Sequence, residues 1–442
     1  MRAMRSSHQC AAAAAAAGMR GARPAGPSGD LLRPSRAPAA VLRRRVSTAL
    51  AAAVAPAAAV APAVDERPNI VGMTQDELQR AIEPLGMKPF VARQIWRWLH
   101  TKGALSFAAM HNLSKRNQAA LAQHLRIWTG GVDSDLCSTD GTRKWLLRFD
   151  ERTAVEAVYI PEAARGRGSM CLSSQCGCTL ACSFCHTGTQ KISRNLTAAE
   201  IVGQLLVARR ALGDAGRVTS AEHPRAVSNI VMMGQGEPLY NYRNVKKALQ
   251  IAMDGDGIGI SRRRITLSTS GVVPLIGRLG RDLSVGLAIS LHAVDNDLRD
   301  ELVPANKQWP IEELLDACRA YPKRSGTRRI TFEYILIEGV NDSLGEAREL
   351  LRLLRGIPSY VNLIPFNPWP GAPEDYARPS NARVSAFQRV LIDGGLSSIV
   401  RATRGEDILA ACGQLHSTAE ASAELRAIGQ AAAQQQQTQQ QQ

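Results

Sequence analysis

The chain has 442 residues, of which 45% are hydrophobic, and a net charge of +15. This length accommodates a full-sized catalytic domain and a smaller module. Arginines and prolines interrupt the one long alanine-rich stretch, and no other apolar run is long enough to span a membrane, so we expect no membrane segment. The size also argues against a small disulfide-stapled secreted scaffold, and the basic balance fits a polyanionic partner.

The two ends of the chain have low-complexity sequences. Residues 1–64 contain nine arginines and a single acid among many alanines, prolines and serines. Such a segment cannot bury a core and is typical of an organelle transit peptide, with the chloroplast favoured over the mitochondrion. A disordered tail without an address, on a cytoplasmic protein, is the alternative. Residues 419–442 are rich in alanine and glutamine, and we expect them to be disordered too.

Residues 66–130 predict a small helical module. Thr74 stands three residues before Glu77, which is the spacing of a capping box at a helix start. The runs KPFVARQIWRWLHTKG and NLSKRNQAALAQHL predict two further helices. The module either stabilises the main domain as a three-helix bundle or uses its basic and aromatic residues to grip a nucleic acid, and the sequence supports both equally.

Residues 131–165 predict a linker with two strands, KWLLRF and AVEAVYI. From 166 to 418, a short apolar run followed by a loop and a helix recurs six times. The runs are SMCLSS, SNIVMMG, RITLSTS, VGLAISLH, RITFEYILI and YVNLIPFN, and the helices lie near 197–213, 241–254, 273–281, 310–321, 343–355 and 381–394. This alternation predicts a parallel sheet, either open and doubly wound or a partial barrel, with the chemistry at the strand ends.

Four of the nine cysteines lie within the ten residues CGCTLACSFC, 176–185. A structural zinc site uses two separated cysteine pairs, whereas only one C-x-x-C pair occurs here, so an iron–sulfur cluster fits better. Cys178, Cys182 and Cys185 would bind three irons of a four-iron cluster and leave the fourth open to the amino and carboxylate groups of S-adenosylmethionine. Cys176 could close that fourth iron, but the single residue between it and Cys178 leaves little reach, and we expect a free thiol.

This cysteine triad, placed after the first apolar run of six β–α units, resembles the radical SAM superfamily, and MMGQGEPLYN fits that superfamily's glycine-rich strand end. Together with LSSQCGCTLACSFCHTG, RRITLSTSGVVP, LAISLHAVDN, FEYILIEGVND, LIPFNPWPG and VRATRGEDILAACGQL, the chain resembles the RlmN/Cfr family over about 68–416. The resemblance implies a partial (βα)6 barrel resembling a TIM barrel, a [4Fe-4S] cluster, and methylation of an adenosine carbon in RNA.

The helical module resembles the RlmN branch of that family, which modifies carbon 2, rather than the Cfr branch, which modifies carbon 8. The implied substrate is large-subunit (23S-type) ribosomal RNA, with transfer RNA as a further candidate. The implied partners are an electron donor such as flavodoxin or ferredoxin, and we expect a monomer. The implied cofactor contacts are made by Gly236, Glu237, Ser268, Ser290, Leu291, His292 and Asn367.

The resemblance also assigns three catalytic residues. Cys412 would carry the methyl group as S-methylcysteine, with two S-adenosylmethionine molecules used per turnover. Cys171 would attack the sulfur of Cys412 and form a transient disulfide that frees the product. Glu156 would remove the proton from carbon 2.

Each of these residues also has an ordinary structural interpretation. Cys412 and Cys171 could be small buried hydrophobes, and Glu156, alternating with apolar neighbours, could lie on a solvated face of its strand. Two other functional classes stay open: a radical SAM enzyme with a different substrate, and a non-catalytic RNA-binding protein that keeps the fold. The loss of a cluster cysteine or of Cys412 would favour the latter, and all are present.

Overall fold

The computed structural model describes residues 65–216, 224–322 and 329–417. The predictions for the transit-like segment 1–64 and the tail 419–442 fall outside these ranges. Within them, the main feature is a ten-stranded sheet in the order β1-β2-β3-β4-β7-β8-β9-β10-β11-β12. The strands are β1 (Gly131–Cys137), β2 (Arg143–Arg148), β3 (Ala154–Glu162), β4 (Arg167–Cys171), β7 (Val227–Met232), β8 (Ile265–Thr269), β9 (Gly286–Ser290), β10 (Ile330–Leu336), β11 (Ser359–Pro365) and β12 (Ser398–Val400).

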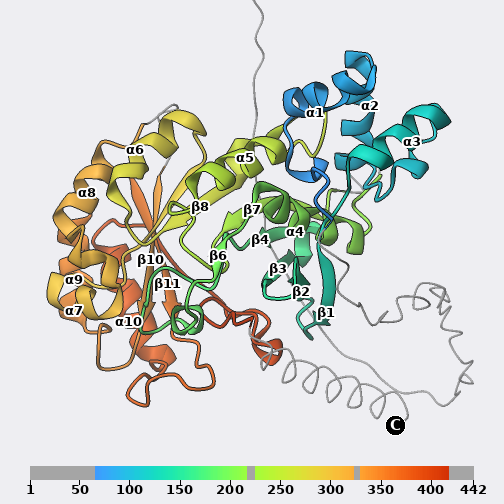
Figure 1. Ribbon diagram of the computed structural model, residues 1–442. Helices are drawn as coiled ribbons and strands as arrows, with labels where there is room; N and C mark the ends of the chain where they lie inside the picture. Colours follow the sequence, from blue (N-terminus) through green and yellow to red (C-terminus); the bar gives the residue numbers. More distant parts are fainter. Residues whose placement is uncertain (1–64, 217–223, 323–328, 418–442) are drawn as a thin grey trace, which may run out of the picture. The chain divides into compact units, whose positions relative to one another are not determined.

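Six neighbouring strands of this sheet, β4 and β7 to β11, run parallel to one another. Helices follow them in the expected order and surround the curved sheet on its outer side (Figure 1). These helices are α4 (Ala198–Ala211), α5 (Tyr242–Met253), α6 (Val273–Asp282), α7 (Asn296–Leu302), α8 (Ile311–Arg319), α9 (Leu344–Leu353) and α10 (Asn381–Asp393). The six predicted β–α units are therefore confirmed, and since β1 and β12 end the sheet without pairing to each other, the barrel is a partial one.

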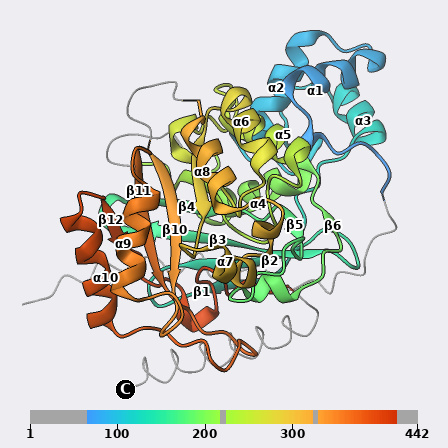
Figure 2. The same cartoon turned by 90° about the vertical axis from the view of Figure 1, so that its left-hand side faces the viewer.

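Further strands extend the sheet on both sides of the six β–α units. On one side, β1, β2 and β3 continue the sheet in antiparallel fashion, with β3 paired to β4. On the other, β12 pairs in parallel with β11, and α9 and α10 lie beside them (Figure 2). The sequence analysis missed β1, α7 and β12. All three are short or polar, and β1 alternates half-buried and exposed residues because it forms the sheet edge.

Burial explains why the parallel strands read as continuous apolar runs. All seven residues of β10 are buried, because neighbouring strands and helices cover both of its faces. A small two-stranded sheet, β5 (Gln175–Cys176) with β6 (Arg194–Asn195), closes off the loop that carries the clustered cysteines. Within the residues that the structure describes, no helix combines the length and apolar character needed to cross a bilayer.

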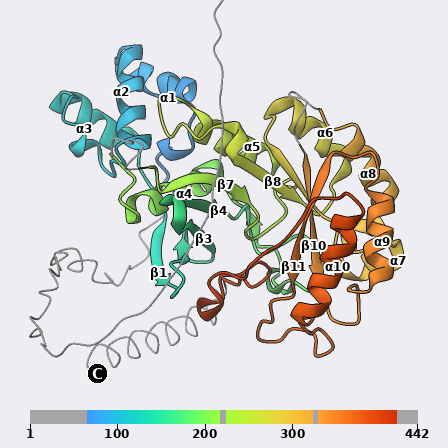
Figure 3. The same ribbon diagram turned by 180° about the vertical axis from the view of Figure 1, so that it is seen from behind.

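The N-terminal module contains the three predicted helices, α1 (Gln75–Ile82), α2 (Pro89–His100) and α3 (Lys115–His124). The capping box is present, with Thr74 and Glu77 each accepting a hydrogen bond from the other's backbone N–H. The module lies beside α4 and α5 (Figure 3) and shares their hydrophobic core, and Trp96 Nε1 donates to Asp254 at 3.1 Å. These contacts support the stabilising role, whereas an RNA-gripping role stays a prediction.

Candidate active site

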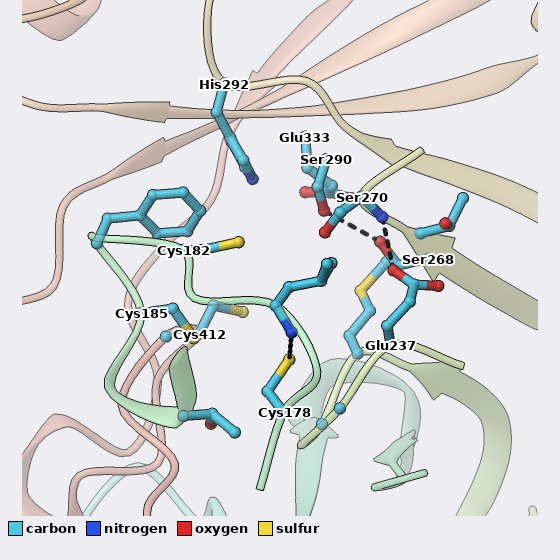
Figure 4. A pocket seen from close by; sticks show the side chains of 18 of the residues that line it. Cys178, Cys182, Cys185, Glu237, Ser268, Ser270, Ser290, His292, Glu333 and Cys412 are labelled. Atoms are coloured by element: carbon cyan, nitrogen blue, oxygen red, sulfur yellow. Dashed lines mark hydrogen bonds between the residues drawn. The ribbon is translucent and has the colours of Figure 1, made fainter. Parts of the chain in front are cut away.

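A cavity opens at the carboxyl ends of the parallel strands, where the strand-end polar residues were expected to gather (Figure 4). Three segments far apart in the sequence enclose it: the cysteine loop, the ends of β7 to β11, and the segment that follows β12. The predicted site residues in its lining are Cys178, Cys182, Cys185, Gly236, Glu237, Ser268, Ser290, His292 and Cys412.

The three cluster cysteines lie together on the floor of this cavity (Figure 4). Burial, reinforced by the neighbouring thiols, raises the pKa of Cys182, and burial likewise raises the pKa of Cys178 to about 12. Thiols in such a setting stay protonated until a metal binds them as thiolates. Three thiols of one loop face the same cavity. A cluster places each thiolate on a different iron, so the arrangement fits a cluster.

Cys176 does not share the cavity lining with the other three. Its side chain is buried in the main hydrophobic core, and Sγ lies 3.6 Å from the carbonyl oxygen of Ala154. Gly177, next to it, has a φ of +77°, which turns the chain between Cys176 and Cys178. Of the four cysteines in this loop, three therefore face the cavity, as the cofactor chemistry requires.

Glu237 and the glycines before it form the wall beside the cysteines. Gly236 has a φ of +91°, and a Cβ atom there would lie 2.4 Å from the side chain of Gln175, so only glycine fits. Glu237 is buried and accepts hydrogen bonds from the backbone N–H of Leu239 at 3.0 Å and of Ser270 at 2.8 Å. Burial raises the pKa of Glu237 to about 7. A buried carboxylate of this kind suits the positively charged amino group of a ligand.

The ends of β8 and β9 supply hydroxyl groups and an imidazole. Ser268 Oγ lies 3.5 Å from Ser290 Oγ, and His292 points into the cavity (Figure 4). Burial lowers the pKa of His292 to about 3, so its ring is neutral. Because Nδ1 accepts a hydrogen bond from Ile335 N–H at 3.0 Å, the ring proton resides on Nε2. Phe184 packs edge-on against the same ring and covers the cysteine floor.

Leu291 and Asn367 lie just outside the lining. The backbone N–H of Leu291 donates to Glu333 and its carbonyl accepts from Arg299, so its polar groups are already used. Asn367 Nδ2 donates to the carbonyl oxygen of Cys412 at 3.3 Å, which places Asn367 against the segment that carries Cys412.

Cys412 connects the cofactor cavity to a second group of residues. It lines the cavity, and it lies close enough to both Cys185 and Cys171 that a Cys412 thiolate would raise the pKa of each. Cys171 is buried; burial, followed by the charge of Cys412, raises its pKa to about 12. Both are free thiols, and no disulfide joins cysteines of the described ranges, so the transient pairing stays a prediction.

Strand register explains how Cys171 and Glu156 come to face Cys412. In the antiparallel pairing, Cys171 of β4 stands opposite Val158 of β3, and Glu156 lies two residues from Val158 on the same face. The segment after β12 covers that face, where Ile408, Ala410 and Leu415 pack against Val158 and Cys171. Glu156 is therefore fully buried rather than on a solvated face.

Three further residues complete the site, and the sequence analysis singled out neither Lys144 nor Arg299. Lys144 forms an ion pair with Glu156 at 2.8 Å, and Arg299 donates to the carbonyls of Ser270, Ser290 and Leu291, fixing the ends of two strands. Arg401, whose positive charge suits RNA phosphates, also interacts with the thiols, because the charge of Cys412, above all, raises the pKa of Arg401. For Lys144 the available signal was its place next to the apolar run WLL, because a lysine is buried only when paired.

Comparisons with known proteins agree with this geometry. Residues 68–127 match the model of the ribosomal RNA large subunit methyltransferase N-terminal domain, and residues 172–354 match that of the radical SAM superfamily. The chain is 53% identical over 356 residues to the dual-specificity RNA methyltransferase RlmN of Gluconobacter oxydans, covering 80% of this chain and 87% of that protein. It is 54% identical over 351 residues to the RlmN of Granulibacter bethesdensis, covering 79% and 88%.

The chain belongs to the RlmN family of radical SAM methyltransferases. A solved structure of a radical SAM methyltransferase from Sphaerobacter thermophilus superposes with a TM-score of 0.73 at 43% identity, covering 79% of this chain and 99% of that one. The cofactors are therefore a [4Fe-4S] cluster and S-adenosylmethionine, as expected. Cys178, Cys182 and Cys185 would hold the cluster, and Glu237 with the strand-end residues would hold S-adenosylmethionine.

Proposed function

We propose that this RlmN-family enzyme methylates carbon 2 of an adenosine in large-subunit ribosomal RNA, with transfer RNA as a second substrate. The family models and the name "dual-specificity RNA methyltransferase" of its relatives support this pair of substrates. One structural observation supports the transfer route most strongly: Cys412 lies between the cluster cysteines and a buried face that carries Cys171 and Glu156. A radical SAM enzyme with a simpler substrate needs no such pair of thiols.

The chemistry of the target explains the need for a cysteine carrier. Carbon 2 of adenine lies between two ring nitrogens, is electron-poor, and does not attack a sulfonium methyl group as a nucleophile. When bound, the cluster and two S-adenosylmethionine molecules per turnover supply the methyl group and the one-electron chemistry that activates it. Cys412 holds that methyl group as S-methylcysteine and presents its carbon to the ring, which binds it and becomes linked to the enzyme.

Release of the product then needs Glu156 and Cys171. The linked ring gives up its unpaired electron, for which the oxidised cluster would be the acceptor, and Glu156 takes the proton from carbon 2, so that the electron pair of the broken C–H bond restores the aromatic ring. Cys171 gives up its thiol proton as its sulfur attacks the sulfur of Cys412, and the sulfur–carbon bond breaks. Its electron pair stays on the carbon, which takes a proton and becomes the methyl group. The two cysteines are left as a disulfide, which an external thiol must reduce before the next turnover.

The RNA must bring the base out of its stack to reach this site, because the cavity lies inside an α/β barrel. Beside the cysteine loop, a second hollow is lined by Arg148, Arg152 and Lys191. These cations suit the phosphates that flank a flipped nucleotide. Methylation of carbon 8 is the second candidate, and the match of the N-terminal module to the RlmN branch favours carbon 2.

The cellular setting is part of the proposal. We infer an organellar substrate, in a chloroplast in preference to a mitochondrion, because residues 1–64 are rich in arginine and nearly free of acids. A fluorescent protein fused to these residues should enter the organelle, and a uniformly cytoplasmic signal would contradict the proposal. A flavodoxin or ferredoxin would supply electrons to the monomeric enzyme.

Mass mapping of RNA digests tests the reaction itself. Reconstituted enzyme, S-adenosylmethionine and a reductant are incubated without oxygen with unmodified ribosomal or transfer RNA. We expect a single new 2-methyladenosine, which chromatography separates from the carbon-8 isomer. C412A, which lacks the carrier sulfur, should give no product. An 8-methyladenosine, or product formation by C412A, would overturn the proposal.

A further inference from the structure

Lys144 and Glu156 form an ion pair that is almost completely removed from water. The Lys144 side chain is 2% exposed and that of Glu156 is 0% exposed, and Nζ lies 2.8 Å from Oε1. Both residues come from the antiparallel extension of the barrel, where Lys144 of β2 stands opposite Val158 of β3. Glu156 lies two residues from Val158 on the same face, so the register directs both charged side chains to one side of the sheet.

Stability alone does not account for this pair. The cost of removing both charges from water commonly equals or exceeds their mutual attraction, and well-packed apolar residues of similar size serve as well or better. Among the other ion pairs of the described residues, only Arg209–Asp214 is buried to a similar degree, at 5% and 0% exposed, whereas Lys247 and Glu77 are about one-third exposed. A buried pair beside the reacting sulfurs therefore calls for a chemical reason.

The two partners also hold both ends of the segment that carries Cys412. Lys144 Nζ donates to the carbonyl oxygen of Leu409 at 3.0 Å, and Glu156 Oε2 accepts from the backbone N–H of His416 at 2.8 Å. Leu409 has a φ of +50°, an unfavourable conformation for leucine that requires support from its surroundings. The ion pair thus connects the base to the methyl carrier through contacts on either side of Cys412.

We propose that Lys144 is a positioning residue for the transfer step, which holds Glu156 as a charged base at a fixed place relative to Cys412. This inference rests on the proposed function, because it gives Lys144 a role only if Glu156 takes the carbon-2 proton. Before transfer, the ammonium group balances the carboxylate and directs Oε1. During transfer, the C–H electron pair stays in the ring and the proton moves to the carboxylate, while Lys144 keeps its own proton and its bond to Leu409.

The hydrogen bond from His416 N–H to Glu156 Oε2 complements the contact of Lys144 with Oε1. Because each oxygen has its own partner, the carboxylate cannot rotate freely. The backbone N–H of Glu156 is itself fixed, because it donates to Gln235 Oε1 at 3.0 Å. Without Lys144, the carboxylate would be buried without a counter-charge and would stay protonated. A protonated Glu156 cannot accept the carbon-2 proton.

An isotope effect separates this role from a purely structural one. K144M and E156Q are compared with wild-type enzyme on RNA whose target adenosine carries hydrogen or deuterium at carbon 2. For K144M we expect kcat to fall by about 10²-fold or more, the loss typical of a missing general base, with KM for RNA nearly unchanged. We also expect a larger deuterium effect on kcat than in wild type, because proton removal has become rate-limiting.

Two controls keep the result interpretable. K247M breaks the Lys247–Glu77 pair between α5 and α1, far from the site, and should keep wild-type kcat and isotope effect. The double variant K144M/E156Q leaves no unpaired buried charge, so it should fold and load the cluster even where K144M does not. If Lys144 acts through Glu156, the double variant is no slower than E156Q alone.

The outcomes are distinct. Wild-type turnover by K144M, a loss of rate without a larger isotope effect, or a double variant slower than E156Q would overturn the role of Lys144 and leave Glu156 as the base. Full turnover by E156Q would overturn the base assignment, and the role of Lys144 with it. In that case, continued formation of 2-methyladenosine would still support the reaction as a whole.

Discussion

Two buried carboxylates near Cys412 differ in how their charge is balanced. Glu237 belongs to the cavity with the cluster cysteines, which we call the cofactor side, and Glu156 belongs to the buried face with Lys144 and Cys171, which we call the transfer side. Glu237, on the cofactor side, accepts hydrogen bonds from two backbone N–H groups, and no lysine or arginine of the described residues pairs with it. Glu156, on the transfer side, has Lys144 at 2.8 Å. Burial raises the pKa of both groups, to about 7 for Glu237.

This difference indicates which charged group each carboxylate interacts with during the reaction. We propose that the carboxylate of Glu237 lacks a protein cation because its positive partner, the amino group of the cofactor, arrives when the cofactor binds. The charge of Glu156 is balanced within the protein, so no cationic ligand is needed, and a proton is what it can accept during the reaction. The cofactor side is thus completed by binding, whereas the transfer side is complete before any ligand binds.

Removing one cluster thiol should have the largest effect, because it should inactivate the cofactor side and leave the transfer side intact. In C182A the cofactor side loses a ligand, and we expect cluster content and product formation to be abolished while the transfer side stays folded. The matched control is C176V, whose thiol lies in the core near Ala154 and should keep full iron content and activity. Iron analysis, visible absorbance and product assays check both. Iron loss in C176V would show that a fourth thiolate binds the cluster.

Removing Cys171 should damage the transfer side alone. C171A keeps the cluster and the methyl carrier, so the ring can still become linked to Cys412, but no thiolate can then break that link. We expect loss of turnover and accumulation of a covalent enzyme–RNA adduct, visible as a mass increase on Cys412. C318A is the control, because Cys318 is equally buried but lies on α8. Normal turnover by C171A would refute the resolving role.

The two sides also differ in how far the sequence could predict them. The three cluster cysteines and Glu237 of the cofactor side lie in two short segments, 178–185 and 234–237, so residue spacing indicates the chemistry of this side. The transfer side requires Lys144, Glu156, Cys171 and Cys412 to meet. Their meeting depends on strand register and on residues 408–415, which lie about 250 residues further along the chain and fold back over β3. Here the sequence offered only a family resemblance. Glu156 looked equally suited to a solvated face, because nothing near it in the sequence encodes its cover.

The uncompensated charge of Glu237 should make the apoprotein less stable as the pH rises. The folded state keeps the proton up to about pH 7, whereas the unfolded chain releases it near the ordinary value of 4.5. Between these values the folded state binds more protons, so stability falls with increasing pH, by about 3 kcal/mol in total.

E237Q stays neutral throughout and should be the more stable apoprotein at pH 8, by up to about 3 kcal/mol, and nearly equal to wild type at pH 4.5. Urea unfolding of both proteins at the two pH values checks this. If the free energy of unfolding changed equally with pH in wild type and E237Q, a protein cation would have to balance Glu237. The contrast with Glu156 would then disappear.

The smallest expected effect comes from one hydroxyl on the cofactor side. S268A removes a group that lines the cavity and lies 3.5 Å from Ser290 Oγ. A neutral hydrogen bond contributes about 1 kcal/mol, so the KM for S-adenosylmethionine should rise about fivefold. At saturation, kcat should not change, because the transfer side does not use this hydroxyl. The control is S228A, which removes a buried hydroxyl on β7 that bonds Gly168. A lower kcat in S268A would mean that strand-end residues of the cofactor side also govern transfer, and that the two sides of Cys412 do not act separately.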